Sequence, residues 1–310
     1  MRILVSGGAG FVGSHTVDAL AARGGHEIAI IDNLAAGKRE QVNPRARFYQ
    51  ADLRDAPAVR GVIERERPEV LVHLAAQMDV RRSVADPAFD AQVNLVGFLN
   101  LMEAGRENGL RRVVFSSTGG AIYGEQECFP CDEEHPQRPV SPYGIAKLAT
   151  EKYLFFYRAQ YGIDYVALRY ANVYGPRQDP HGEAGVVAIF CGRVLEGRPV
   201  TIYGDGGQTR DYVYVADVVR ANVAALESTV SGAFNVGTGV ETSVNQLYDA
   251  LARNAGISRA AEFGPPRPGE QRRSVILPER AARELGWRPQ VELSDGLAQT
   301  LRFFRDRAAR

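Results

Sequence analysis

Apolar runs that break into glycine or polar residues recur through the first half of the chain. Runs of this length predict strands that are buried on both faces of a sheet. They lie at residues 2–10, 27–33, 47–55, 68–76, 111–117 and 164–175. Between several of them, apolar residues recur at helical spacing, at residues 11–24, 89–109 and 141–162. The alternation predicts an α/β protein with a Rossmann-type, doubly wound parallel sheet.

The pattern loosens after about residue 175, where glycine and proline cluster repeatedly. Helical spacing persists in five further segments, at residues 184–196, 215–228, 243–254, 278–285 and 293–309. These features predict a smaller, discontinuous α/β lobe that binds the substrate. We assign residues 1–173 and about 211–238 to the sheet domain, and about 174–210 and 239–310 to the second lobe.

Composition excludes several kinds of protein. The 310 residues carry 37 basic and 37 acidic side chains, so charge gives no reason to expect binding to nucleic acid or to an anionic membrane. The N-terminal apolar run is too short for a signal peptide or a membrane span, so we expect a cytoplasmic protein. Cys128 and Cys131 form one C-x-x-C pair without a second, so we expect no metal site.

Residues 7–13 read Gly-Gly-Ala-Gly-Phe-Val-Gly, between the first predicted strand and the first predicted helix. In that context the glycines predict a dinucleotide site, because they let the backbone approach a pyrophosphate at a helix N-terminus. Asp32 ends the second predicted strand, 19 residues after Gly13. A carboxylate there grips the ribose hydroxyls of NAD and repels the extra phosphate of NADP. We therefore expect NAD, although Lys38 and Arg39 follow closely.

Other residues at the ends of predicted strands are expected to line the same site. Asp52 and Leu53 close the third strand beside the adenine, and small residues close the fourth. His73 is expected to pack or cap and not to catalyse. The cofactor-binding set from this part of the chain is Gly7, Gly10, Phe11, Val12, Gly13, Asp32, Asn33, Asp52, Leu53, Leu74, Ala75, Ala76 and Gln77.

Tyr143 and Lys147 stand four residues apart in a predicted helix with Ser141 as its N-cap, so they share one face. Lysine is otherwise rare in this chain, whose basic residues are almost all arginine. An ammonium group and the positive ring of an oxidised nicotinamide both favour a phenolate, so we expect the pKa of Tyr143 to fall toward neutrality. Such a tyrosine takes a proton from a sugar hydroxyl while hydride leaves the same carbon.

With these motifs the chain resembles the extended short-chain dehydrogenases/reductases. Downstream segments make it similar to the members that modify nucleotide sugars, the UDP-glucose 4-epimerases. These segments are RYANVYGPRQ, TIYGDGGQTRDYVYVADV, RPGE and LGWRP. The resemblance covers nearly the whole chain, and it implies tightly bound NAD and a UDP-hexose substrate. It also implies a homodimer, for which the physical support is the aromatic helix 152–161, whose outer face would pair with helix 94–104 of a partner.

The resemblance assigns roles to residues that spacing alone does not single out. Asn94, Ser116 and Tyr170 would lie on the cofactor side, with Tyr170 beside the nicotinamide. Arg210 and Arg267 would clamp the diphosphate, a task that suits a guanidinium fork. The remaining substrate contacts would come from Gly119, Gly120, Asn172, Val186, Tyr203 and Glu270.

The segment 115–125 reads FSSTGGAIYGE at the end of the fifth predicted strand, where doubly wound folds bind ligands. The family has a catalytic Ser/Thr here, which relays a proton between the sugar and the tyrosine. That position falls on Thr118 or on Gly119, depending on the end from which the segment is counted. We favour Thr118 and keep Ser117 as the alternative. The two glycines would then absorb the extra residue and leave room for a sugar to turn over.

Related enzymes begin with the same oxidation at C4 and differ in the next step. Dehydratases and decarboxylases carry an acid in the corresponding segment, whereas residues 118–123 contain none and Glu125 comes too late. We therefore expect the ketone to turn over and regain hydride on its other face, which inverts C4. Ser274, a small residue after RPGE, would also admit N-acetylated sugars. A UDP-glucuronate 4-epimerase, a decarboxylase, a 4,6-dehydratase and, more remotely, a non-catalytic NAD-binding regulator stay open.

Overall fold

The computed structural model describes residues 1–180, 185–266 and 271–308. Its centre is a sheet of seven parallel strands in the order β11-β6-β5-β4-β1-β2-β3. The order reverses between β1 and β4, so a ligand crevice is expected at the carboxyl ends of these strands. The predicted fold class is confirmed. The seven strands are β1 (Arg2–Ser6), β2 (Glu27–Asp32), β3 (Arg47–Gln50), β4 (Val70–His73), β5 (Arg112–Thr118), β6 (Asp164–Tyr170) and β11 (Gly232–Val236).

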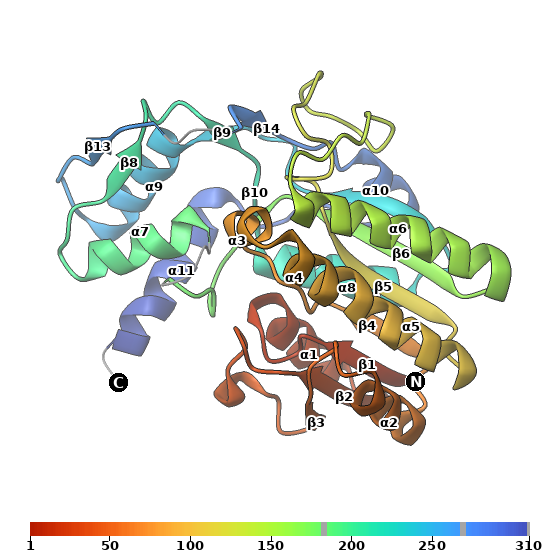
Figure 1. Ribbon diagram of the computed structural model, residues 1–310. Coiled ribbons are helices and arrows are strands. Elements are labelled where there is room, and N and C mark those ends of the chain that lie inside the picture. The colour runs from red at the N-terminus through yellow and green to blue at the C-terminus, as the bar shows by residue number, and fades with distance from the viewer. Residues whose placement is uncertain (181–184, 267–270, 309–310) are drawn as a thin grey trace.

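Helices cover both faces of this sheet (Figure 1). Successive strand residues point to opposite faces, so Ile3 and Val5 of β1 pack on one side while Leu4 packs on the other. Helices cover both faces, which explains why the strands other than the edge strand β3 read as apolar runs in the sequence. The main helices on the first face are α1 (Phe11–Arg23) and α8 (Val215–Glu227), and those on the second are α2 (Ala56–Glu66), α5 (Gly97–Glu107) and α6 (Pro142–Tyr161).

A further apolar core lies beside the sheet, in the upper left of Figure 1, and includes Tyr174, Phe190 and Leu247. Phe11 and Val12 of α1 pack against this core, so the turn after β1 lies between the two lobes. The helices of this lobe are α7 (Val186–Leu195), α9 (Val244–Ala255) and α11 (Leu293–Ala308). Its short strands pair as β7 (Asn172–Tyr174) with β10 (Tyr212–Tyr214), β8 (Thr201–Tyr203) with β13 (Glu262–Gly264), and β9 (Thr209–Arg210) with β12 (Thr242–Ser243) and β14 (Arg273–Ser274).

The single helix expected over residues 89–109 is divided in three. A short helix, α4 (Pro87–Ala91), runs into one π-helical turn, η2 (Gln92–Val96), and α5 then continues to Glu107. A π turn widens the helix locally and changes which side chains face the sheet. The small elements before it are a 3-10 turn, η1 (Arg39–Gln41), and α3 (Val80–Ala85).

Two other segments depart from the sequence-based prediction. The strand expected over 164–175 breaks at Ala171, because Asn172 to Tyr174 pair with β10 instead of continuing the main sheet. Helix α10 (Glu279–Glu284) contributes Ala281 to the core of the sheet domain, although its segment was assigned to the second lobe. The exact division into domains stays a prediction.

Candidate active site

The turn after β1 consists of glycines because neighbouring backbone leaves no space for side chains. Gly7 has a φ of +74°, and a Cβ built there would lie 2.6 Å from the backbone nitrogen of Ala75. A Cβ at Gly13 would collide with the carbonyl oxygen of Gly7. The turn therefore packs tightly between the start of α1 and the end of β4.

Gly10 has a different role in the same turn. It is the N-cap of α1, and no side chain caps this helix. Only the carbonyl oxygen of Gly7, 3.2 Å away, lies near a Cβ built at Gly10, so the space in front of the turn is clear. The first N–H groups of a helix have no acceptor within it. Together with the positive end of the helix dipole, these groups suit an anion such as a pyrophosphate.

The buried carboxylate of Asp32 is tied to this glycine turn. Its Oδ2 accepts the N–H of Ala9 at 3.0 Å, and its Oδ1 accepts the N–H of Leu34 at 2.8 Å. Gly37 lies over the carboxylate, since a Cβ there would be 3.0 Å from Oδ2. Each oxygen keeps a further lone pair that a ribose hydroxyl can use. The glycine turn and Asp32 thus form one preformed unit.

Asn33, Asp52 and Leu53 lie together at the ends of β2 and β3. The side-chain amide of Asn33 donates to Asp52 at 3.0 Å, and the guanidinium of Arg54 donates to both oxygens of Asp52 at 2.9 and 2.8 Å. These donors, Arg54 foremost, hold the pKa of Asp52 well below its usual range. Leu53 is buried against Gly97. Contact of these residues with an adenine stays a prediction.

The end of β4 forms the opposite wall. Gln77 donates its backbone N–H to Asn94 Oδ1 at 2.8 Å, and Asn94 Nδ2 donates to the carbonyl oxygen of Gln77 at 2.9 Å. His73 shares a 2.6 Å hydrogen bond with the hydroxyl of Ser6 and stacks on Phe115. Burial lowers the pKa of His73 to about 3, so this ring is neutral. His73 is therefore a packed histidine, as expected.

Tyr143 and Lys147, here called the catalytic pair, occupy the first turns of α6. Ser141 caps this helix by accepting the N–H of Gly144 at 3.2 Å, as predicted. The ammonium group of Lys147 donates to the carbonyl oxygen of Ser116 at 2.7 Å and lies 5.7 Å from the centroid of the Tyr143 ring. Lys147 is therefore fixed between the tyrosine and the strand that carries the hydroxyl residues.

Burial controls the charge of the catalytic pair. It lowers the pKa of Lys147 to about 7, while the carboxylates of Asp90 and then Glu151 act in the opposite direction. Burial, followed by Asp90, raises the pKa of Tyr143. Burial therefore opposes deprotonation of Tyr143 in the NAD-free protein. The expected fall of its pKa, which also requires the positive nicotinamide ring, stays a prediction.

The hydroxyls of β5 differ in their partners. Ser117 donates to Glu151 at 2.5 Å, and Glu151 also forms a buried ion pair with Arg169 at 2.7 Å. Thr118, the last residue of the strand, accepts the N–H of Ala121 at 3.2 Å. That bond leaves the hydroxyl proton of Thr118 available to another acceptor. Of the two candidate relays, Thr118 has the free donor.

The two glycines that follow face different surroundings. A Cβ at Gly119 would lie 2.6 Å from the side chain of Ile276, so that side is filled. A Cβ at Gly120 would make only ordinary contacts, 3.8 Å from Asn172 Oδ1 and 3.9 Å from Thr118 Oγ1. Of the two positions, only Gly120 could therefore carry a side chain without a clash, and it lies close to Thr118 and Asn172. Room there for a sugar to turn over stays a prediction.

The predicted substrate residues of the second lobe lie on its short elements. Asn172 opens β7, and its backbone N–H donates to Asp211 at 2.8 Å. Val186 begins α7 and is partly buried against the lobe's core. Tyr203 ends β8 with 36% of its surface exposed. Their contact with a uracil or a sugar stays a prediction.

Of the two arginines expected to clamp the diphosphate, only Arg210 lies among the described residues. Arg210 ends β9 and pairs in register with Ser274 of β14, whose side chain is buried. The nucleotide and sugar contacts predicted for Arg267 and Glu270 lie outside the described residues.

Tyr170 ends β6 and is buried at the centre of the molecule. Its hydroxyl donates to Asn222 of α8 at 2.6 Å, and Asn222 in turn donates to Thr16 of α1 at 3.2 Å. The hydroxyl therefore braces two helices. The expected position of the ring beside a nicotinamide stays a prediction.

Comparison with known proteins identifies the family. The model of the NAD dependent epimerase/dehydratase family matches residues 3–237. A UDP-glucose 4-epimerase from Mycolicibacterium smegmatis is 49% identical, over 99% of this chain and 100% of its own. The chain belongs to the NAD-dependent epimerase/dehydratase family. The resemblance inferred from the motifs is confirmed.

Two solved structures of this family superpose on nearly the whole chain. A UDP-glucose 4-epimerase from Thermotoga maritima, solved with UDP-glucose, has a TM-score of 0.97 and 49% identity, and covers 99% of this chain and 100% of its own. The same enzyme from Thermus thermophilus, in complex with NAD, has a TM-score of 0.93 and 51% identity, with 98% and 99% covered.

The geometry fits the cofactor of the family. The clear space at Gly10, the uncapped start of α1 and the carboxylate of Asp32 offer the pyrophosphate and ribose contacts that NAD requires. The segment after β4, where Asn94 holds the backbone of Gln77, provides a wall on the other side. NAD is the cofactor.

Sequence reasoning missed three residues of this site. Gly37 lies over Asp32, Glu151 holds Ser117, and Asp90 holds Asn94 at 2.9 Å. The signal available for the last two was their spacing, since Asp90 precedes Asn94 by four residues and Glu151 follows Lys147 by four. Residues so spaced share a helix face.

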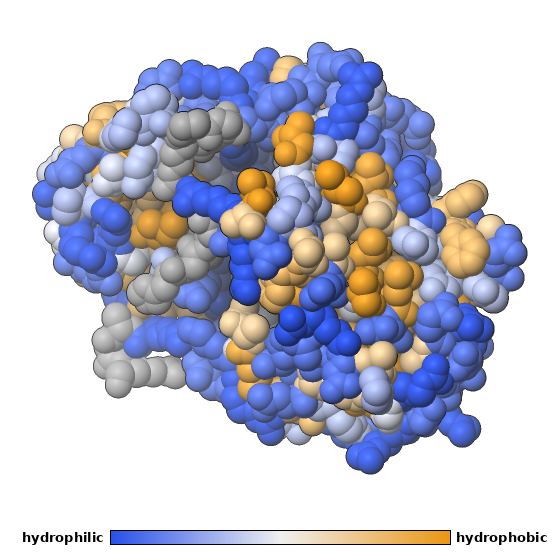
Figure 2. Space-filling model, viewed as in Figure 1, coloured by the Kyte–Doolittle hydropathy of each residue, from blue (hydrophilic) through white to orange (hydrophobic). Residues whose placement is uncertain are grey.

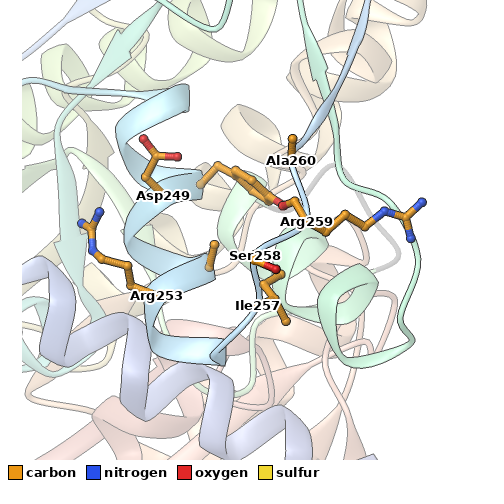
Figure 3. A pocket seen from close by; sticks show the side chains of 8 residues that line it. Asp249, Arg253, Ile257, Ser258, Arg259 and Ala260 are labelled. Atoms are coloured by element: carbon orange, nitrogen blue, oxygen red, sulfur yellow. The ribbon is translucent and has the colours of Figure 1, made fainter.

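Other kinds of site find little support in the described part of the chain. A shallow pocket at the end of α9 is lined by Tyr248, Arg253 and the segment 257–260, none of which belongs to the site above (Figure 3). The described residues contain no group of three or more His, Cys, Asp or Glu side chains arranged to hold a metal ion. Among them, too, no helix has the length and apolarity needed to cross a bilayer.

Proposed function

We propose that this protein inverts C4 of a UDP-hexose, interconverting UDP-glucose and UDP-galactose through a transient 4-keto sugar. One observation carries the proposal. Lys147 lies beside the ring of Tyr143 and donates to the carbonyl oxygen of Ser116. Ser116 stands two residues before Thr118 on the same strand, β5. The hydroxyl oxygen of Thr118 lies 3.9 Å from a Cβ built at Gly120, and a sugar hydroxyl bound there would find a proton acceptor.

The chain's own residues bind the reactants and move one proton. NAD, which the glycine turn and Asp32 would hold, would supply a hydride acceptor for C4 and a positive nicotinamide ring that favours the phenolate. Thr118 passes the proton of the 4-hydroxyl to Tyr143, which gives it back when the ketone is reduced. In its ammonium form, Lys147 favours the phenolate of Tyr143, whose ring centroid lies 5.7 Å from the lysine nitrogen. The reaction thus consumes neither protons nor hydride.

Among the described residues, the segment that follows Thr118 favours inversion over elimination or decarboxylation. The segment 118–123 contains no acid or base, and Glu125 is exposed to solvent. Of the nearby buried carboxylates, Glu151 is paired with Arg169, and Glu133 accepts the backbone N–H of Asn235 at 2.6 Å. Neither is available to remove a proton from C5.

We also propose that N-acetylated UDP-hexoses are accepted, because Ser274 is small and lies beside Arg210 in the sheet of the second lobe. Incubation of the purified protein with UDP-glucose, UDP-galactose and UDP-N-acetylglucosamine, followed by analysis of the released sugars, tests both proposals. Expected products are the C4 epimers, without added NAD and without net NADH. Release of water or carbon dioxide, or net formation of NADH, would overturn the epimerase assignment.

We propose a homodimer formed through α6. This helix exposes a run of large apolar side chains, and hydrophobic atoms gather over the face formed by α4, α5 and α6 (Figure 2). The exposed side chains are Ile145, Tyr153, Phe155, Phe156 and Tyr161.

A cytoplasmic location stays a prediction from the sequence.

A further inference from the structure

Asp90 lies within the short helix α4, beside the candidate active site, and is 1% exposed. None of the ion pairs among the described residues includes it. A buried carboxylate without a cationic partner is costly, so its retention calls for a physical reason. The two oxygens of this carboxylate differ in their surroundings.

The first oxygen, Oδ1, holds the cofactor wall. It accepts the side-chain amide of Asn94 at 2.9 Å and that of Gln77 at 3.0 Å. Asn94 in turn fixes the backbone of Gln77 through both its N–H and its carbonyl oxygen. Asn94 lies in the π turn η2, four residues after Asp90, so the two side chains share a helix face. Asp90 therefore orients two residues of the predicted NAD site.

The second oxygen, Oδ2, is buried and has no hydrogen-bond partner. Helix α4, which carries it, packs against α6, which carries the catalytic pair. The charge of Asp90 acts on both members of that pair. Burial is the larger influence on each, but the carboxylate of Asp90 raises the pKa of Tyr143 and that of Lys147.

The other ionisable groups around the pair are neutral, paired or exposed. His73 of β4 is neutral because burial lowers its pKa to about 3. Glu151 of α6 is paired with Arg169 of β6. The remaining charged groups of α3 and α4 are Asp79, which caps α3, and the exposed side chains of Arg81, Arg82 and Asp86.

We propose that Asp90 is a positioning residue of this active site: one oxygen fixes Gln77 and Asn94, and the other keeps a negative charge beside the catalytic pair. The inference rests on the proposed function, since it assigns Asp90 a part in the chemistry of Tyr143 and Lys147. Its consequence is that Asp90 sets the pH range in which the tyrosine is deprotonated while the lysine stays charged.

Asp90→Asn tests this assignment, because the amide keeps the size and the Oδ1 acceptor but removes the charge. A negative charge raises the pKa of any neighbouring group, so its loss lowers both pKa values. We expect both limbs of the pH profile of kcat/KM to move to lower pH by about one unit. A purely structural role would lower the activity at every pH and leave the limbs in place.

Asp86→Asn is the matched control. Asp86 lies on the same helix, is exposed, and caps α4 through the N–H of Phe89 at 3.0 Å, a task that asparagine also performs. We expect its pH profile to coincide with that of the wild type. Asp90→Ala also removes the hydrogen bonds, so it should show the same shift together with a lower maximum.

If the two limbs of the pH profile of Asp90→Asn coincide with those of the wild type, the inference is overturned. A wild type without epimerisation would overturn the proposed function instead, and Asp90 would then be tested by titration of the phenolate absorbance. The absorbance of Asp90→Asn minus that of Asp90→Asn/Tyr143→Phe, followed as a function of pH, isolates the titration of Tyr143. Its pKa should be lower than in the wild type, and an unchanged pKa contradicts the inference.

Discussion

Ser117 and Thr118 are adjacent in the sequence yet have different surroundings. Alternation along β5 sends Ser117 toward Glu151, 34 residues further on, while Thr118 faces Asn172 across Gly120. The sequence favoured Thr118 and kept Ser117 as the alternative, because the partner that occupies Ser117 comes from a distant helix. That tertiary contact supports Thr118, whose role as the relay stays a prediction.

Thr118→Val removes the hydroxyl at nearly constant shape. If Thr118 relays the proton, kcat falls by about 10²-fold or more, since general acid–base assistance contributes that much. Ser117→Ala is the matched comparison: it loses one buried hydrogen bond, which costs about 1 kcal/mol of stability, and keeps most of its activity. Steady-state kinetics and chemical denaturation of both variants measure this. If Ser117→Ala loses more activity than Thr118→Val, Ser117 is the relay.

Lys147 makes the stability of the NAD-free protein depend on pH. Its pKa falls from 10.5 to about 7 in the folded state, so between these values the unfolded chain binds more protons and stability rises with pH. Lys147→Met removes this dependence. From about pH 6 to about pH 9, we expect the unfolding free energy of the wild type to gain roughly 2–3 kcal/mol relative to the variant. Denaturant titrations at the two pH values measure it, and a constant difference contradicts it.

At the scale of elements, the sequence predicts the strands and helices that have unbroken local patterns. Apart from the edge strand β3, the strands of the main sheet are buried on both faces. The cap at Ser141, with Pro142 after it, marks the start of α6 correctly. The π turn at 92–96 and the break at Ala171 were missed, because both depend on contacts with other elements. A helical period alone does not reveal one widened turn.

The pair Gly119 and Gly120 allows a matched test of an element end. In Gly119→Ala the new methyl would strike Ile276, which is fully buried, so we expect a loss of about 1–3 kcal/mol in stability. In Gly120→Ala the methyl meets ordinary contacts but enters the space beside Thr118 and Asn172. We expect unchanged thermal stability and a kcat/KM lower by about tenfold. Calorimetry and steady-state kinetics on both variants measure these effects. A stable Gly119→Ala or a fully active Gly120→Ala would contradict the prediction.

At the scale of the whole molecule, one sheet and two lobes position the site. Phe11 and Val12 leave the glycine turn to pack on the second lobe, so the cofactor cradle lies at the junction of the cores. The sequence predicted both lobes from the change in pattern near residue 175. It did not predict that Ala281 of α10 returns to the first core, since that short helix carries no signal for the face it covers. Long-range packing of short elements is set by the complete fold.

The exposed face of α6 is expected to join two copies of the chain. Phe155 is 61% exposed within this face. In a dimer, a charge placed there would be buried without a partner. We therefore expect Phe155→Arg to weaken association by about 100-fold or more. Val240→Arg is the control, because Val240 is 60% exposed on a loop away from that face. Sedimentation velocity over a dilution series should give dimers for the wild type and for Val240→Arg, but monomers for Phe155→Arg. A wild type that is monomeric at every concentration, or a dimeric Phe155→Arg, would rule out this interface.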